Sequence, residues 1–132
     1  MRASPYAHHG RPIGATRALF DIELELPQPG PRDRRVAVRA VAVNPVHTKV
    51  RRGVATDGPR VLGWDAGGIV DAVGSEVTLF QPGDAVYYAG LVDRPGPNAE
   101  SPLVDGPTLA PRPGVPGRQP PPRPPADGAP AR

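Results

Sequence analysis

Residues able to bind a metal ion or act as nucleophiles are few in this chain and lie far apart. The 132 residues include no cysteine and only three histidines, His8, His9 and His47. The lack of cysteine excludes disulfides, thiolate metal sites and cysteine nucleophiles. A zinc site needs about three ligands of Cys, His or carboxylate type. Because His8 and His9 lie near the N-terminus and His47 stands alone, the sequence predicts no metal site.

Glycine-rich segments raise a second kind of chemistry, the binding of a dinucleotide. A dinucleotide site needs a G-x-G-x-x-G segment between a strand and a helix, where backbone N–H groups hold the pyrophosphate. The spacing of Gly63–Gly68 does not fit this pattern, and neither does that of Gly10–Gly14. We therefore expect these 132 residues to bind no nicotinamide cofactor on their own.

The charged and apolar residues argue against nucleic-acid and membrane partners. The net charge is +3, but acidic residues are interleaved with the arginines, and only Arg34–Arg35 and Arg51–Arg52 are adjacent pairs. Nucleic-acid binding favours clustered basic residues. No apolar run approaches the roughly 20 residues of a membrane span or resembles a signal peptide. A soluble, cytoplasmic protein is the expectation.

The elements that must position any site begin in the first half of the chain. Residues 19–26 alternate apolar and acidic side chains, which predicts a half-buried strand. The valine-rich residues 36–43 predict a strand that is covered on both faces. Asn44 followed by proline favours a helix start, and residues 46–52 are predicted to form a short helix closed by Gly53.

Further strands are predicted in the second half of the chain. Residues 66–73 indicate a strand whose glycine pair marks a bend or a close backbone approach. Residues 81–84, Gln-Pro-Gly-Asp, predict a type II turn, and residues 85–89 a strand after it. Short strands with one or two small helices indicate a mainly β fold, a small β-barrel. Beyond Asp93 the pattern fades.

Three segments together resemble a known family. They are residues 42–53 (AVNPVHTKVRRG), 61–70 (VLGWDAGGIV) and 80–86 (FQPGDAV). In this order they are similar to the medium-chain dehydrogenase/reductase superfamily, in the zinc-independent quinone oxidoreductase branch with its zinc-type alcohol dehydrogenase-like proteins. The resemblance implies a GroES-like β-barrel over residues 1–110 that forms one wall of a cleft. The other wall would be a Rossmann domain holding NADPH, with hydride transfer to a quinone, an enone or a carbonyl.

The resemblance also implies roles for individual residues. Zinc-dependent relatives carry Cys at the position of Asn44 and a His-Glu pair at Trp64-Asp65, so no zinc is expected here. Asn44 would lie near the nicotinamide and the substrate as a catalytic and cofactor-binding residue, donating to a developing enolate oxygen or orienting a water. Asn44 capping the helix is the alternative, and the two roles are compatible. His47 replaces the usual Asp of the family and is a second cofactor-side candidate.

Two aromatic positions are candidates for the substrate cleft. Trp64 is either a core aromatic or a substrate contact. Tyr87 and Tyr88 alternate across a strand, so one is expected to face the core and the other to line the cleft; Tyr88 is the candidate. Glycines in the same segments are explained by backbone geometry.

The C-terminal segment differs in composition from the rest of the chain. Residues 95–132 hold 13 of the 21 prolines, and residues 111–132 are predicted to be a disordered Pro/Arg/Gly-rich tail. Pro121 to Pro124 also satisfies a P-x-x-P spacing. Codons for the residues from near Pro113 onward, read one nucleotide later, can spell segments typical of the family. A frameshift and a genuine proline-rich tail both remain open, and the resemblance places a Rossmann domain outside these residues.

Two classes of function follow. The first is the substrate-side domain of an NADPH-dependent quinone or enone oxidoreductase, expected to be inactive as the 132-residue chain. The alternative is a non-enzymatic β-barrel interaction module with a proline-rich arm. In either case an apolar cleft face left exposed would favour self-association.

Overall fold

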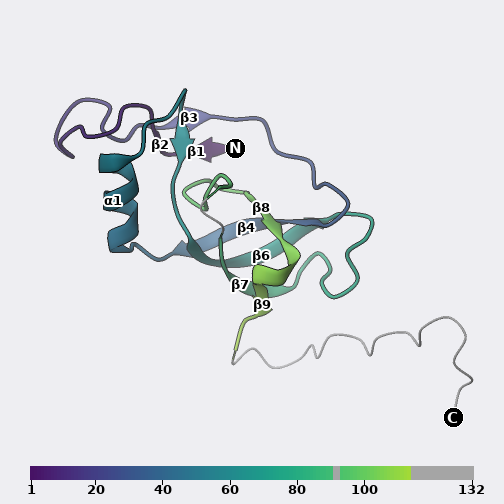
Figure 1. Ribbon diagram of the computed structural model, residues 1–132. Coiled ribbons are helices and arrows are strands. Elements are labelled where there is room, and N and C mark those ends of the chain that lie inside the picture. Colours follow the sequence, from purple (N-terminus) through teal and green to yellow (C-terminus); the bar gives the residue numbers. More distant parts are fainter. Residues whose placement is uncertain (91–92, 114–132) are drawn as a thin grey trace, which may run out of the picture.

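A five-stranded antiparallel sheet forms the centre of the molecule. The computed structural model describes residues 1–90 and 93–113 (Figure 1). The strand order is β8-β4-β6-β7-β9, so the two longest strands, β4 and β6, lie side by side within it. The strands are β4 (Asp33–Val41), β6 (Asp65–Val73), β7 (Ala85–Ala89), β8 (Leu103–Asp105) and β9 (Leu109–Pro111).

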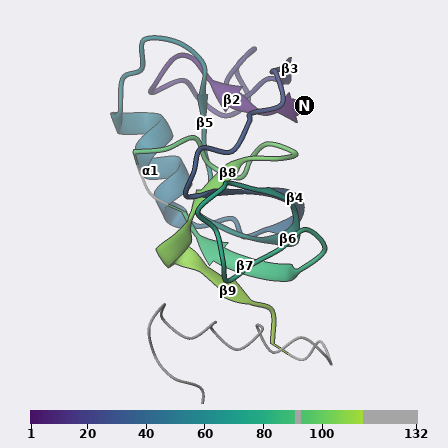
Figure 2. The same ribbon diagram turned by 90° about the vertical axis from the view of Figure 1, so that its right-hand side faces the viewer.

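Two small sheets and two helices complete the described part. Figures 1 and 2 show the small sheets beyond one edge of the large sheet, with the single α-helix alongside. The first small sheet pairs β1 (Arg2–Ala3) with β3 (Ile22–Glu23), and the second pairs β2 (Pro5–Tyr6) with β5 (Arg60–Val61). The helices are α1 (Pro45–Gly53) and the short 3-10 helix η1 (Gly106–Thr108). The expected mainly β fold with one or two short helices is confirmed.

Two apolar clusters hold these elements together. The larger cluster lies within the five-stranded sheet and consists of Val36, Ala66, Val70, Val86, Tyr88, Val104 and Leu109. The smaller cluster joins α1 to β2 and to the segment between β5 and β6, and it consists of Tyr6, Val50, Leu62 and Trp64. The second cluster therefore fixes the helix against the start of β6.

Several local predictions are confirmed. The strands β6 and β7 and the helix α1 lie where the sequence places them. Gly83 has φ +99°, and the Asp84 N–H donates to the Gln81 carbonyl at 3.2 Å, as a type II turn requires. A Cβ atom on Gly68 would overlap the Ala37 carbonyl oxygen of β4, so the glycine pair does mark a close backbone approach.

The prediction for residues 19–26 is wrong in length and in burial. Only Ile22–Glu23 forms a strand, and its partner is the two-residue β1. Leu24 and Leu26 are 39% and 45% exposed. Apolar alternation makes a long half-buried strand only where a neighbouring strand and an apolar layer are available, and here the partner strand is two residues long.

Two further predictions need correction. Residues 36–43 were expected to be covered on both faces, yet β4 ends at Val41, which is 43% exposed, and Val43 beyond it is 84% exposed. The ladder with β6 ends at the pair Val41–Ala66, so the following residues lie past the sheet. Gly53 was expected just past the helix but is its last residue, and extended Val54 ends α1 by donating its N–H to Val50. Residues 111–132 were predicted to be a disordered tail; Pro111 is the last residue of β9, and residues 114–132 lie outside the described residues.

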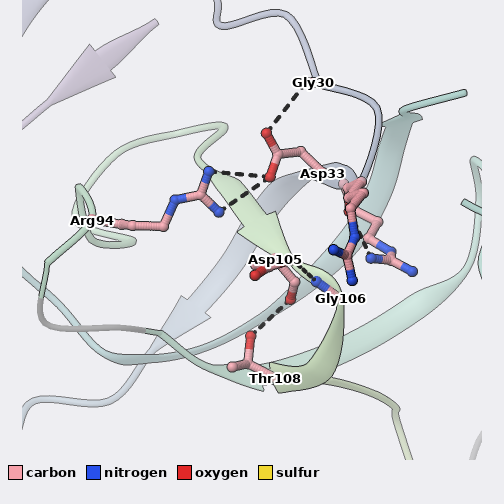
Figure 3. Close-up of polar contacts among 8 residues, drawn as sticks. Gly30, Asp33, Arg94, Asp105, Gly106 and Thr108 are labelled. Carbon is pink, nitrogen blue, oxygen red and sulfur yellow. Dashed lines mark hydrogen bonds and ion pairs between the residues drawn. The ribbon is translucent and has the colours of Figure 1, made fainter. Parts of the chain in front are cut away.

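A cluster of polar groups closes the β8 side of the sheet (Figure 3). The Asp33 carboxylate accepts from the Gly30 N–H at 3.2 Å and from both terminal nitrogens of Arg94 at 3.1 Å. The Asp105 carboxylate accepts from the Gly106 N–H at 2.7 Å, and the Thr108 hydroxyl donates to the Asp105 carbonyl. Asp33 thus ties the start of β4 to two loops.

We expect the Asp33→Ala variant to lower the free energy of unfolding by about 2 kcal/mol. The Asp33 side chain is only 16% exposed, so its loss leaves the Gly30 N–H and the Arg94 guanidinium without this acceptor. Urea denaturation measures the change. Asp57→Ala, in an exposed loop, is the control and should change stability by less than about 0.5 kcal/mol. Equal stability of the two variants would contradict the stabilising role of the Asp33 carboxylate.

Candidate functional site

Asn44 lies between the end of β4 and the start of α1. It is the N-cap residue of the helix, with extended backbone at φ −116°, and Pro45 is the first helical residue. An extended residue followed by proline is the local conformation that Asn-Pro favours. The helix-capping position expected from the sequence is confirmed, and it places the Asn44 side chain beside the sheet.

The Asn44 side chain is paired with a carboxylate from the neighbouring strand. Its Nδ2 donates to Oδ2 of Asp65, the first residue of β6, at 2.6 Å. The pairing follows from the sheet, because the Ala42 N–H donates to the Asp65 carbonyl at 2.9 Å just past the end of the β4–β6 ladder. An amide NH₂ group has two N–H donors, so Asp65 engages one and the other can serve a ligand.

His47 holds the backbone of Asn44 from the helix side. Its ring is buried, and Nδ1 accepts from the Asn44 N–H at 3.1 Å. The ring meets Trp64 edge-on, with centroids 4.9 Å apart and an interplanar angle of 89°. His47 therefore lies in the interior, and what it contacts is Asn44 and the aromatic wall of the second cluster.

An open hollow of about 460 Å³ lies where the ends of β4 and β7 meet the start of β6. Its wall is made of small aliphatic residues, one carboxylate and two tyrosines: Ala40, Val41, Ala42, Asp65, Ala66, Gly67, Tyr87, Tyr88 and Ala89. Asp65 lines the hollow and binds Asn44, so the Asn44 amide lies one side chain away from the apolar wall. Such a site suits a mostly apolar ligand that carries a hydrogen-bond acceptor.

The two tyrosines differ in exposure, as strand alternation requires. Tyr87 is 48% exposed, whereas Tyr88 is 4% exposed and packs in the larger cluster. Burial raises the pKa of the Tyr88 phenol well above its usual value, so this side chain stays neutral. Tyr88 borders the hollow from the core, while Tyr87 offers the accessible ring.

The structure brings some of the predicted residues together and separates others. Asn44, His47 and Trp64 form a chain of contacts, but Trp64 packs in the smaller cluster and is not part of the wall of the hollow. Sequence reasoning did not select Asp65 as a site residue. The resemblance considered Asp65 only as the residue at the position of a Glu in zinc-dependent relatives.

Within residues 1–90 and 93–113, no group of three or more His, Cys, Asp or Glu side chains is placed to hold a metal ion. No helix in this same part of the chain has the length and apolar character needed to cross a membrane.

The fold and the matched segments define the class of protein. The pattern of the alcohol dehydrogenase GroES-like domain matches residues 30–105, which include Asn44 and Asp65. The chain belongs to this family, and its relatives are members of the medium-chain dehydrogenase/reductase superfamily. The family expected from the sequence motifs is confirmed.

Individual relatives show how far the likeness extends. A zinc-type alcohol dehydrogenase-like protein from Staphylococcus aureus is 51% identical over 87 residues, which are 65% of this chain and 26% of that protein. A Rhizobium etli protein described as a zinc-dependent alcohol dehydrogenase superposes with a TM-score of 0.83 at 49% identity, over 87% of this chain and 33% of that one. The quinone oxidoreductase from Escherichia coli complexed with NADPH superposes with a TM-score of 0.74 at 27% identity. That match covers 86% of this chain and 33% of the E. coli chain.

The matches cover only part of the relatives. The chain spans about a quarter of the length of the curated relative and about a third of the two solved structures.

Proposed function

We propose that this chain is the substrate-side domain of an oxidoreductase that transfers a hydride from NADPH to a quinone or an enone. The observation that carries the proposal is the Asn44–Asp65 hydrogen bond at the edge of the apolar hollow. The likeness to the E. coli quinone oxidoreductase complexed with NADPH supports the choice of reaction.

The geometry suggests a division of work among the residues. NADPH, when bound, supplies the hydride. As the carbonyl compound is reduced, negative charge develops on its oxygen, and a fixed N–H donor near that oxygen lowers the barrier. The second N–H of Asn44 is the proposed donor, and the small side chains of the hollow receive the flat apolar ring and exclude water from it.

The residues proposed on the cofactor side act in different ways. Asn44 is partly exposed and can contact a nicotinamide ring beside the hollow. His47 is buried, so its contribution is to hold the Asn44 backbone. Because the 132 residues contain no G-x-G-x-x-G segment, we expect the chain alone to be inactive.

We infer that the reaction does not use zinc. At the three positions where the resemblance to zinc-dependent relatives would place metal ligands, this chain offers an amide, an indole and a carboxylate, from Asn44, Trp64 and Asp65. An indole N–H only donates, and zinc in proteins is bound by about three Cys, His or carboxylate ligands. This donor set does not fit zinc, so the proposed chemistry rests on the amide.

A domain exchange tests the proposal. Residues 30–105 of this chain would replace the matched segment of the E. coli quinone oxidoreductase, and the chimera would be assayed for quinone-dependent oxidation of NADPH. We expect turnover by the chimera and none by the isolated chain. A chimera that unfolds cooperatively and binds NADPH but reduces no quinone would contradict the proposal. Turnover by the isolated chain would contradict the assignment as one domain of the enzyme.

The apolar surface around the hollow predicts self-association of the isolated chain. Val41, Val43 and Tyr87 are 43%, 84% and 48% exposed. Light scattering should therefore detect dimers or larger species, and Val43→Asp should shift the population toward monomer. Leu79→Asp, at an exposed position that is not part of the wall of the hollow, is the matched control and should leave the distribution unchanged. A monodisperse monomer for the unmodified chain would refute this prediction.

A further inference from the structure

We infer that Asp65 is a positioning residue that fixes the orientation of the Asn44 amide. This inference rests on the proposed function, because the orientation matters only if the amide meets a reacting oxygen. Asp65 acts through Asn44 and needs no contact with the substrate.

The two groups in contact are the Asn44 side-chain amide and the Asp65 carboxylate. The two ends of an asparagine amide have nearly the same shape, so an unrestrained side chain can present either its NH₂ or its carbonyl. An ionised carboxylate only accepts hydrogen bonds, so it binds the NH₂ end and rejects the carbonyl. The Nδ2–Oδ2 distance of 2.6 Å is short, as expected for a hydrogen bond to a charged acceptor.

Asp65 and Asn44 are both held by backbone hydrogen bonds or strand pairing. Asp65 is the first residue of β6 and is paired with Ala89 of β7. Its carbonyl accepts from the Ala42 N–H of the segment that leads to Asn44. His47 holds the Asn44 backbone from the other side, with Nδ1 accepting at 3.1 Å. Backbone and side chain of Asn44 are thus each held by a separate partner, which restrains both its position and its rotation.

The orientation of the Asn44 amide decides whether a ligand in the hollow meets an N–H donor or a carbonyl oxygen. With one N–H bound to Asp65, the NH₂ group remains beside the carboxylate that lines the hollow. A ligand oxygen in the hollow would then meet a donor. In the flipped orientation the same oxygen would meet the amide carbonyl, which repels it. Removing Asp65 leaves the amide free to adopt both orientations.

A test on the complete 132-residue chain uses nuclear magnetic resonance. The chain contains only two asparagines, Asn44 and Asn98, so their side-chain amide signals can be assigned from a nitrogen-15 spectrum. We expect one Asn44 amide proton to be shifted strongly downfield by the carboxylate, and Asp65→Ala to remove that shift while the Asn98 signals stay unchanged. An Asn44 amide signal unaffected by Asp65→Ala, in a chain with an otherwise native spectrum, would overturn the inference.

A double-mutant cycle in the chimera tests the functional part. Asp65→Ala should lower kcat by roughly tenfold with little change in KM, because a misplaced donor costs rate more than binding. Asp65→Asn, whose side-chain oxygen still accepts, should restore part of the loss. In the Asn44→Ala background, Asp65→Ala should have no further effect on kcat.

The outcomes of the cycle separate positioning from other roles. A purely structural Asp65 would lower kcat by the same factor with or without Asn44, and that result would overturn the inference. A chimera that carries Asp65, unfolds cooperatively and binds NADPH but reduces no quinone would contradict the proposed function itself. The Asn44 side-chain amide signal of the 132-residue chain tests the Asn44–Asp65 hydrogen bond independently of quinone reduction.

Discussion

Replacing Asn44 by alanine in the chimera is expected to lower kcat for quinone reduction by about a hundredfold. The reason is the loss of an N–H donor at the oxygen that gains negative charge, an effect that in other enzymes costs roughly a hundredfold to a thousandfold. The KM for the quinone should change much less, because the apolar wall of the hollow is intact. Steady-state oxidation of NADPH measures both constants.

The control for this variant must account for the second role of Asn44. Asn44 is also the N-cap residue of α1 and donates to Asp65, so its replacement by alanine is expected to cost about 1 kcal/mol of stability. The assay should therefore be run well below the unfolding temperature of both proteins. Asn98→Ala removes the other asparagine and should leave kcat unchanged. An Asn44→Ala chimera that keeps more than half of its activity would refute the proposed role.

The second large effect is expected from Gly68→Ala, which should lower the free energy of unfolding by about 3 kcal/mol. Gly68 pairs with Val38 across the β4–β6 ladder, next to a register shift in β4. A Cβ atom there would overlap the Ala37 carbonyl oxygen and lie 2.8 Å from Cγ1 of Val36. The carbonyl belongs to the backbone of a central strand, so relief requires the ladder to open. Denaturation in urea measures the loss.

The adjacent glycine provides a matched control. On Gly67 an added Cβ would lie 3.5 Å from the Val86 carbonyl oxygen, which is an ordinary van der Waals contact. Gly67→Ala should therefore change stability by less than about 1 kcal/mol, although it is the same substitution in the same strand. Equal effects at the two positions would show that close approach at Gly68 does not limit the packing of β4 against β6.

Local signals in the sequence were sufficient for the elements around the site. Asn-Pro at the start of α1 sets both the N-cap and the first helical residue. Pro-Gly before Asp84 selects a type II turn because only glycine readily adopts the positive φ at its third position. The helix start and the turn each depend on the conformational preferences of adjacent residues, which can be inferred from the sequence alone.

Elements that depend on distant partners could not be predicted in this way. The strands β1 and β8 have two and three residues, too few for a periodic pattern, and each exists because of its partners. Arg2 pairs with Glu23, and Leu103 pairs with Arg35. Residues 19–26 show the reverse case, an alternating pattern with almost no partner.

In the functional site, too, some features could be predicted from the sequence and others depend on distant partners. Asn44 could be selected because its segment resembles a known family. Its pairing with Asp65 joins residues 21 positions apart and depends on how the β4–β6 ladder ends, which the sequence does not state. The register of β7 likewise decides that Tyr87 is exposed and Tyr88 is buried.

The proposed role of Asn44 can be tested with a crystal structure of the chimera that holds a bound quinone and oxidised cofactor. We expect the quinone ring in the hollow beside Tyr87, with one oxygen about 3 Å from Nδ2 of Asn44 and the Asn44–Asp65 hydrogen bond intact. A ring bound elsewhere, or bound in the hollow with its oxygens directed away from Asn44, would contradict it.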